Sequence, residues 1–331
     1  MDDTEAMDRA IALAAGVRTR TSPNPWVGCV LVTRDGEVFE GATAPPGGPH
    51  AEVTALAAAG PKTRGATVVT TLEPCAHHGR TPPCADALID AGVARVVVAI
   101  TDPDPHVAGQ GIARLRQVGI TTEVGVRAEA VTEQLAAYLT HRRTGRPYVV
   151  LKLAATLDGR TAAPDGSSQW ITGPEARTDA HRLRAESDAV LVGAGTVRAD
   201  DPSLTVRHVE VDHQPIRVVL GQVPADAQVQ PALELEGDLG EVLDTLGAKG
   251  VLQVLVEGGA TVAGAFHRAG LVDRYVVYLA PALTGGDDSR PLFAGPGAPT
   301  IADVWRGEIA DVRRLGDDIR IDLVARPEGA S

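Results

Sequence analysis

Two repeating patterns of apolar and polar positions run through the first part of the chain. Short apolar runs bounded by Gly, Pro or Asp predict strands, and stretches with apolar residues three or four apart predict helices. We expect a hairpin over 27–41 that turns at Asp35 and Gly36, and further strands at 66–72, 93–100 and 121–126. We expect helices at 4–15, 51–59, 84–91, 112–118 and 128–142. This alternation predicts a three-layer α/β domain.

A polar stretch with Gly and Pro at 142–147 ends this pattern, and a β-rich pattern begins directly after it. We expect strands at 148–153, 189–192, 216–220, 251–256, 274–280 and 319–325. We expect helices at 175–186 and 260–269, and a loop at 193–202. The chain of 331 residues is long for one domain, so we predict two α/β domains, 1–145 and 146–331.

Composition and charge argue against some classes of partner. The chain carries 43 acidic and 31 basic residues, a net charge of −12, which argues against an extended nucleic-acid interface. No apolar run approaches the roughly 20 residues that span a bilayer, and the acidic N-terminal segment lacks the basic region of a signal peptide. Cys29 lies in an apolar run typical of a buried core thiol. We expect a cytoplasmic protein without a membrane partner.

His50, Glu52, Cys75 and Cys84 form the strongest chemical signal. Neutral imidazole and thiolate are zinc ligands, and three protein ligands leave a position open for water at a catalytic zinc. Glu52 follows His50 by two residues and is free to move protons, as in zinc deaminases that combine H-x-E with P-C-x-x-C. Here eight residues, rather than two, separate Cys75 from Cys84.

A structural metal site or a pair of buried thiols would use the same cysteines. A structural zinc normally has four protein ligands, and no obvious fourth is present, although His77 and His78 are near in sequence. Glu52 adds a proton shuttle to the three ligands, so we favour a catalytic zinc.

The second domain carries weaker signals. The segments 193–196 and 258–261 each follow a predicted strand and could bring backbone amides to a phosphate, although such turns are often only structural. Lys152 lies among apolar residues of a predicted strand, where a desolvated Lys is a candidate acid or substrate anchor. The alternative is a Lys at a strand edge whose ammonium group reaches water.

Several longer motifs accompany these residues in both predicted domains. In the first domain they are SPNPWVG (22–28), HAE (50–52), EPCAHHGRTPPC (73–84) and VAGQG (107–111). In the second they are KLAATLDGR (152–160), SQWIT (168–172), VGAGTVRADDPSLTVR (192–207) and VEGG (256–259). Together these motifs resemble the bacterial bifunctional deaminase/reductase family of riboflavin biosynthesis, over nearly the whole chain. The long spacing between Cys75 and Cys84 is similar to that family's form of the deaminase motif.

For the first domain, the resemblance implies a cytidine-deaminase-like fold and a small-molecule substrate, the diaminopyrimidinone ribosyl phosphate made from GTP. Water replaces the 2-amino group of the ring, and ammonia leaves. Asn24 would bond the pyrimidine. The residues that would help to hold the substrate are His77, Arg80 and Asp102, with Arg80 suited to the phosphate. The family often has D-P-N-P where this chain has Asp104, whose carboxylate cannot donate a hydrogen bond.

For the second domain, the resemblance implies a dihydrofolate-reductase-like α/β fold that uses NADPH to reduce the ribosyl group to ribityl at C1′. The apolar neighbours of Lys152 lead us to favour it as a catalytic residue. The cofactor contacts would be Ala154, Trp170, Thr196, Asp200 and the segment 259–265, which includes Gly259, Ala260 and Thr261. The substrate contacts would be Ser168, Arg184, Leu204, Arg207 and Glu257. Asp200 could equally belong to a capped turn, and Arg207 to the surface. The segment 221–250 is short for the family, which predicts weaker or altered NADPH binding.

Two other functions compete with a bifunctional enzyme. One is a deaminase whose C-terminal domain no longer reduces and serves oligomerisation, and the other is a zinc-binding, nucleic-acid-associated protein. The presence of Lys152, Asp200, Arg207 and Glu257 counts against the first, and the charge counts against the second. We expect a zinc- and NADPH-dependent bifunctional enzyme that forms a homo-oligomer, either a dimer or a tetramer.

Overall fold

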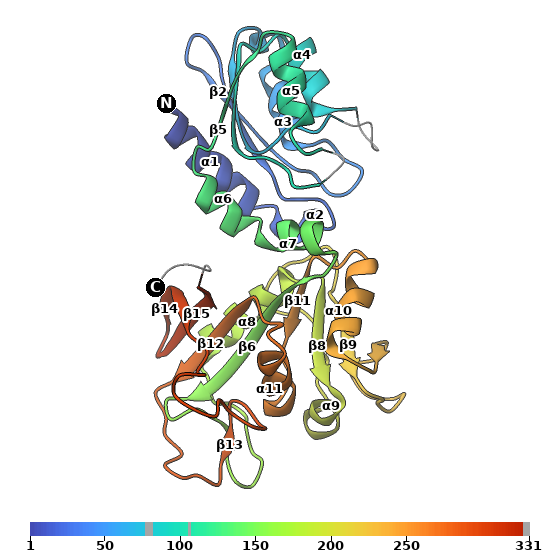
Figure 1. The fold of residues 1–331 in the computed structure, drawn as a ribbon, viewed down its shortest axis with the longest axis vertical. Helices are drawn as coiled ribbons and strands as arrows, with labels where there is room; N and C mark the ends of the chain where they lie inside the picture. Colours follow the sequence, from blue (N-terminus) through green and yellow to red (C-terminus); the bar gives the residue numbers. More distant parts are fainter. Residues whose placement is uncertain (77–81, 105–106, 327–331) are drawn as a thin grey trace. The chain divides into compact units, whose positions relative to one another are not determined.

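The computed structural model describes residues 1–76, 82–104 and 107–326. The chain divides into two compact units, Met1–Gly145 and Arg146–Ser331, each built around its own sheet (Figure 1). Within the described residues, no helix combines the length and the apolar character needed to cross a membrane.

The first unit contains a five-stranded sheet with the strand order β2-β1-β3-β4-β5. β1 (Gly28–Val32) runs antiparallel to both of its neighbours, β2 (Val38–Ala42) and β3 (Thr67–Leu72). β3, β4 (Arg95–Ile100) and β5 (Thr121–Val124) are parallel to one another. β3 and β4 are buried along most of their length, as is typical of parallel strands with helices on both faces.

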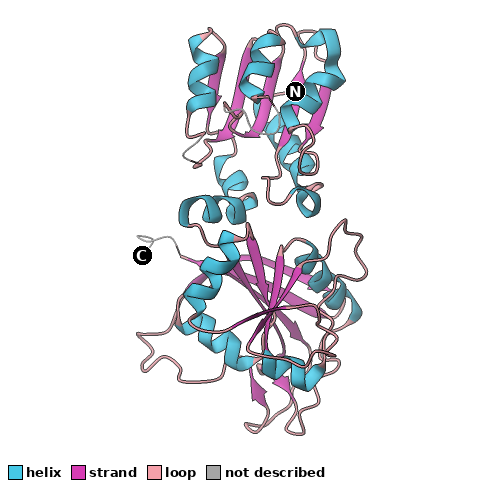
Figure 2. Ribbon diagram, turned by 90° about the vertical axis from the view of Figure 1, so that its right-hand side faces the viewer, coloured by secondary structure: helices cyan, strands magenta, loops and turns pink. Residues whose placement is uncertain are grey.

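Helices lie on both faces of this sheet and complete the three layers expected from the sequence (Figure 2). α1 (Asp3–Ala15) and α6 (Ala128–Gln134) cover one face. α3 (Ala51–Ala59), α4 (Cys84–Asp90) and α5 (Gln110–Gln117) cover the other. The shorter helices are α2 (Arg18–Thr21), the 3-10 helix η1 (Gly60–Thr63) and α7 (Ala136–Thr144). Cys29 is fully buried in β1, as predicted.

The second unit contains an eight-stranded sheet with the order β10-β9-β8-β11-β6-β12-β15-β14. The six strands from β10 to β12 are parallel, and β15 and β14 add an antiparallel edge. A separate pair joins β7 to β13. The strands are β6 (Tyr148–Thr156), β7 (Arg160–Ala162), β8 (Ala189–Gly193), β9 (Ile216–Leu220), β10 (Leu233–Leu235), β11 (Gln253–Val256), β12 (Arg274–Ala280), β13 (Arg290–Pro291), β14 (Gly307–Leu315) and β15 (Asp318–Ala325).

Two apolar cores lie on opposite faces of this sheet. α10 (Leu239–Ala248) and α11 (Ala260–Arg268) contribute to one core. α8 (Pro174–Ala185) and α9 (Ala194–Asp200) contribute to the other. This mixed α/β architecture agrees with the fold expected for the second half of the chain.

The structure corrects several details of the predicted elements. The expected loop 193–202 is wrong, because α9 begins at Ala194 and buries Ala194 and Val197 against the sheet. The expected helix 128–142 is divided at Leu135 into α6 and α7. α10, β10 and β14 were not predicted, and each lies where the sequence pattern was assigned no element.

Candidate active sites

One cluster in the first unit joins the three predicted metal ligands. His50 caps the N-terminus of α3, Cys75 lies just beyond the end of β3, and Cys84 opens α4. The Nδ1 atom of His50 lies 3.2 Å from Sγ of Cys84 and 3.6 Å from Sγ of Cys75. The ligand atoms of all three residues lie within 4.8 Å of one another, a spacing that suits one metal ion.

The two thiols differ sharply in their readiness to ionise. A hydrogen bond from the Cys84 thiol outweighs the effect of burial and, together with the Cys84 backbone N–H at 3.3 Å, lowers the pKa of Cys75 to about 4. The same interaction raises the pKa of Cys84 above its usual range. The hydrogen bond between the two sulfur atoms favours a thiolate at Cys75, and a metal ion bound here would take the place of the shared proton and have two thiolate ligands. One imidazole and two thiolates form a donor set that fits Zn²⁺.

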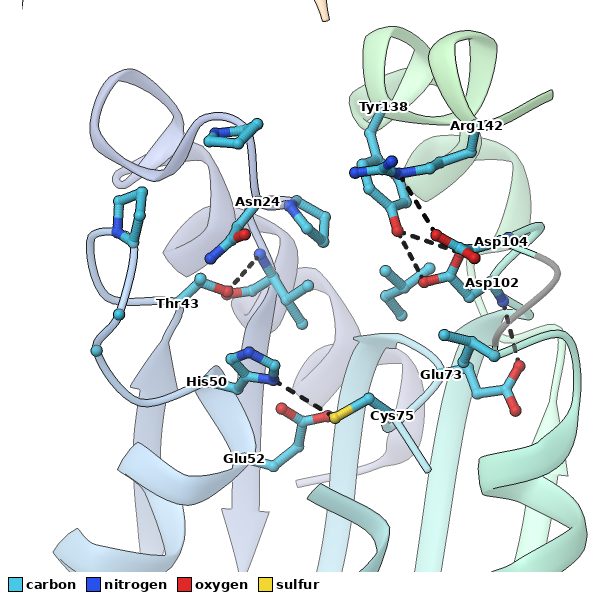
Figure 3. A pocket seen from close by; sticks show the side chains of 18 residues that line it. Asn24, Thr43, His50, Glu52, Glu73, Cys75, Asp102, Asp104, Tyr138 and Arg142 are labelled. Carbon is cyan, nitrogen blue, oxygen red and sulfur yellow. Dashed lines mark hydrogen bonds and ion pairs between the residues drawn. The ribbon is translucent and has the colours of Figure 1, made fainter. Parts of the chain in front are cut away.

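Glu52 lies in the first turn of α3, directly beside this cluster (Figure 3). It is only 3% exposed, and burial raises the pKa of its carboxyl group. A buried carboxyl group with a raised pKa is suited to accept a proton and to return it.

A cavity of about 410 Å³ opens over these residues. His50, Glu52 and Cys75 line its floor, while Asn24 and Asp102 face it from opposite sides (Figure 3). The expected residues Asn24 and Asp102 thus line the same cavity as His50 and Cys75, two of the predicted metal ligands. The other two expected substrate contacts, His77 and Arg80, lie outside the described residues.

Glu73 organises one wall of this cavity, a role that the sequence did not reveal. Its buried carboxylate accepts hydrogen bonds from the backbone N–H groups of Asp102 (3.2 Å), Gly109 (2.9 Å), Gly111 (3.0 Å) and Ile112 (3.2 Å). These bonds tie the segment that carries Asp102 to the strand end that carries Cys75. Two further lining residues, Tyr138 and Arg142 of α7, also escaped the sequence analysis.

A second charged cluster lies within the second unit. Glu257 follows β11, Lys152 is on β6, and Arg184 is in the last turn of α8. The Glu257 carboxylate accepts from Nε and Nη2 of Arg184 at 2.5 and 3.1 Å, and it lies 3.6 Å from Nζ of Lys152. Arg184 also donates to the carbonyl oxygen of Thr205 at 3.1 Å, next to Leu204.

The electrostatics of this cluster keep Glu257 ionised. Burial opposes its ionisation, but Arg184 and Lys152 outweigh burial and lower the pKa of Glu257 to about 2. His181, one turn before Arg184, accepts a hydrogen bond at Nδ1 from the backbone N–H of Arg207 at 3.0 Å. Burial and the nearby Arg184 lower the pKa of His181 to about 4, so its ring is neutral at physiological pH.

The expected cofactor residues lie mainly at the carboxyl ends of neighbouring parallel strands. β8 leads into α9 with Thr196 and Asp200, and β11 leads through Gly259 into α11, which opens with Ala260 and Thr261. The Gly259 N–H donates to Oγ1 of Thr196 at 3.3 Å, so these two turns meet. Ligands of open α/β sheets bind at such strand ends.

The remaining expected residues come from other segments of the second unit. Ala154 is on β6, two residues after Lys152. Ser168 and Trp170 lie between β7 and α8, and the Trp170 ring is 68% exposed beneath the Arg177 guanidinium. The last two expected residues, Leu204 and Arg207, lie in the segment between α9 and β9. Leu204 is buried and has a φ of +51°. Arg207 donates a hydrogen bond to Oγ of Ser203 at 2.8 Å.

Comparisons with known proteins match both units. A model of the cytidine and deoxycytidylate deaminase zinc-binding region matches residues 1–100, and a model of the RibD C-terminal domain matches residues 147–321. The riboflavin biosynthesis protein RibD of Escherichia coli (strain K12) is 43% identical, over 98% of this chain and 100% of its own. The chain belongs to the RibD family. RibD of Mycobacterium tuberculosis (strain H37Rv) is 45% identical over 97% of each chain.

Solved structures of RibD proteins agree with this assignment. Acinetobacter baumannii RibD (form 1) superposes with a TM-score of 0.92 at 41% identity and covers 98% of this chain and 99% of its own. A Thermotoga maritima structure with a TM-score of 0.88 is 33% identical, over 98% of this chain and 99% of its own. Its name is diaminohydroxyphosphoribosylaminopyrimidine deaminase/5-amino-6-(5-phosphoribosylamino)uracil reductase.

Membership of the RibD family establishes several expectations from the sequence. The chain combines a cytidine-deaminase-like domain with a dihydrofolate-reductase-like RibD C-terminal domain, and it is a bifunctional deaminase and reductase of riboflavin biosynthesis. Zn²⁺ serves the first activity and NADPH the second. Because the match extends through the second unit, a deaminase with a C-terminal domain that only serves oligomerisation is not favoured.

Proposed function

We propose that Glu52 is the proton shuttle of the deamination and that His50, Cys75 and Cys84 are the ligands of its zinc. When bound, Zn²⁺ lowers the pKa of a water molecule to about 7 and so supplies the nucleophile that replaces the 2-amino group. Glu52 would take one proton from the attacking water and pass it to the ring nitrogen, then take the remaining hydroxyl proton and pass it to the amine, which leaves as ammonia. The observation that carries this proposal is a buried carboxyl group beside a His/Cys/Cys cluster at the floor of one cavity.

Four residues are assigned to the pyrimidine substrate in this proposal. Asn24 bonds the ring, and Asp102 accepts from donors of the substrate on the opposite side of the cavity. The position of both side chains on the cavity wall supports these roles. His77 and Arg80 complete the set, with Arg80 at the phosphate, and these assignments rest on the motif EPCAHHGRTPPC alone.

The second unit is assigned the reduction of the ribosyl group. NADPH, when bound, supplies the hydride for C1′, and we assign Lys152 as the acid or anchor at that sugar. The pair of contacts from Glu257 to Arg184 and Lys152 supports a shared substrate site. The proposed substrate contacts are Ser168, Arg184, Leu204, Arg207 and Glu257. The proposed nucleotide contacts are Ala154, Trp170, Thr196, Asp200, Gly259, Ala260 and Thr261, of which Thr196 and Gly259 are hydrogen-bonded to each other.

Several wider expectations remain proposals. A cytoplasmic setting is supported by the composition, and a small-molecule substrate rather than nucleic acid is supported by the charge of −12. A homo-oligomer, dimer or tetramer, is supported by β14, an edge strand that exposes Ile309 and Val312. The short segment 221–250 predicts weaker NADPH binding, which a titration of the enzyme with NADPH would measure. Within this segment, Gln228 donates to the carboxylate of Asp201, the residue just after α9.

The variant Glu52→Gln tests the deaminase assignment. Gln has the size of Glu but cannot carry the proton, so we expect ammonia release to fall by roughly 10²- to 10⁴-fold. Zinc content, measured by atomic emission, and reduction of the separately supplied deaminated intermediate should stay at the wild-type level. Glu129→Gln, an exposed change on α6, is the matched control. Ammonia release near the wild-type rate in Glu52→Gln would refute the shuttle.

A further inference from the structure

Helix α7 presents two side chains to the wall of the deaminase cavity opposite the zinc ligands (Figure 3). The Tyr138 hydroxyl donates to the Asp102 carboxylate, with distances of 3.0 Å to Oδ2 and 3.3 Å to Oδ1. Nε of Arg142 lies 3.7 Å from Oδ2 of Asp104. The Arg142 guanidinium also lies over the Tyr138 ring, 5.1 Å from its centre.

The charge of the cavity wall makes Arg142 unusual. The described lining includes four acidic side chains, Glu52, Glu73, Asp102 and Asp104. Arg142 is the one Arg or Lys among the described residues that line the cavity. A phosphorylated substrate is itself an anion, and charges interact strongly where water is partly excluded. An acidic cavity that admits such a substrate therefore needs cations, and Arg142 is one in addition to Arg80, which its motif assigns to the phosphate and which lies outside the described residues.

Neighbouring side chains hold the Arg142 guanidinium in place, and some of its N–H groups remain available to donate to a ligand. Its side chain is 31% exposed, so it is partly buried and yet accessible from the cavity. The distance to Asp104 is that of an ion pair and is longer than a hydrogen bond, so the contact leaves donors of the fork-shaped group for another acceptor. The Tyr138 ring beneath it limits its motion through a cation–π contact.

We propose that Arg142 binds the phosphate group of the deaminase substrate together with Arg80 and thereby helps to select the phosphorylated pyrimidine over its unphosphorylated riboside. Arginine forks suit phosphate oxygens because two N–H groups can donate in parallel. Asp104 and Tyr138 are positioning residues for this guanidinium, and Tyr138 also fixes Asp102. The inference rests on the proposed deamination and adds to it a specificity-determining residue.

The test compares two substrates in the full-length zinc-loaded enzyme. Ammonia release is followed with the diaminopyrimidinone ribosyl phosphate and with the same compound lacking the phosphate. In Arg142→Met, KM for the phosphorylated substrate should rise roughly 10- to 100-fold, the range for loss of a charge-assisted hydrogen bond. KM for the riboside and both kcat values should change little. Arg142→Lys keeps the charge and should lose less.

The matched control is Arg143→Met, which removes an exposed Arg from the next position of α7. It should change neither KM. Zinc content and reduction of the deaminated intermediate verify that each variant is folded. A double variant, Asp104→Asn with Arg142→Met, separates phosphate binding from simple neutralisation of Asp104. We expect the double variant to keep the raised KM for the phosphorylated substrate.

Two results would overturn the inference. One is an equal change of KM for both substrates in Arg142→Met, and the other is recovery of the wild-type KM in the double variant. A wild-type enzyme that releases no ammonia from either substrate would instead refute the deaminase assignment itself, and this inference with it.

Discussion

Glu257 gathers the charges of the second site around one carboxylate. It contacts Arg184 and Lys152, which come from α8 and β6, while Glu257 itself follows β11. The Glu257 side chain is only 8% exposed, so water screens its charge poorly. Removal of that negative charge would leave the positive charges of Arg184 and Lys152 without their shared partner.

The pH dependence of stability is expected to follow from this carboxylate. Its folded pKa of about 2 lies below the ordinary value of 4.5, so its contribution is complete above pH 4.5 and is lost as the pH falls from 4.5 towards 2. The shift corresponds to about 3 kcal/mol of unfolding free energy. Glu257→Gln lacks the titrating carboxyl group and should not lose this contribution in acid. The difference in unfolding free energy between wild type and variant should therefore shrink by about 3 kcal/mol as the pH falls from 4.5 to 2.

Calorimetric unfolding of both proteins between pH 2 and pH 6 measures this difference. Glu308→Gln, an exposed change on β14, is the control and should follow the wild type at every pH. A stability gap between Glu257→Gln and wild type that is constant over the whole range would contradict the ion-pair account.

Several residues of the sites were predictable from the sequence, and others were not. The sequence indicated the candidate zinc site because its residues lie within one short stretch and their types are typical of zinc deaminases. These residues are His50, Glu52, Cys75 and Cys84. Glu73 accepts hydrogen bonds from backbone N–H groups between residues 102 and 112. Almost every residue type has such a group, so the sequence does not identify the partners of Glu73. Tyr138 and Arg142 lie on a helix far along the chain, and only the fold brings them to the cavity.

Some helices and strands were predictable from the sequence and others were not, and burial explains much of the difference. Strands buried between two helical layers are continuously apolar, and β9 and β12 begin and end where the sequence predicted. β14 is an edge strand that is exposed along most of its length, so it has no buried pattern to find. α10 has apolar residues at helical spacing, Leu239, Val242, Leu243 and Leu246, so its sequence does carry the signal of a buried helix.

The contact between α5 and the loop that carries Cys75 gives a prediction at this scale. Gly111 in α5 lies so close to Pro74 that a Cβ atom would sit 1.8 Å from the Pro74 carbonyl oxygen. Gly111→Ala must displace backbone beside Cys75 and strain the bonds to Glu73. We expect a loss of about 2 kcal/mol in unfolding free energy, typical of overpacking, together with weaker zinc retention against a chelator.

Gly16→Ala is the control for this change, since a Cβ there meets neighbouring atoms only at 3.4 Å or more. It should alter stability by less than about 0.5 kcal/mol and leave zinc retention unchanged. Equal zinc retention in Gly111→Ala and Gly16→Ala would argue against a structural link between α5 and the metal loop.

On the scale of the whole molecule, both units use the same architectural position for chemistry. In the first unit, Cys75 and Asp102 lie beyond the carboxyl ends of the parallel neighbours β3 and β4. In the second, α9 and Glu257 follow the carboxyl ends of the parallel neighbours β8 and β11. Strand ends of this kind are where ligands of open α/β sheets bind, and the two units place different sets of polar and charged groups there.

The central claim is that one chain removes an amino group and then reduces the sugar of the same substrate. The direct measurement supplies the diaminopyrimidinone ribosyl phosphate to the zinc-loaded enzyme, with and without NADPH, and follows ammonia and NADPH together. We predict ammonia release in both cases and, when NADPH is present, oxidation of one NADPH for each ammonia released. Ammonia release without NADPH oxidation, or neither reaction, would contradict the account.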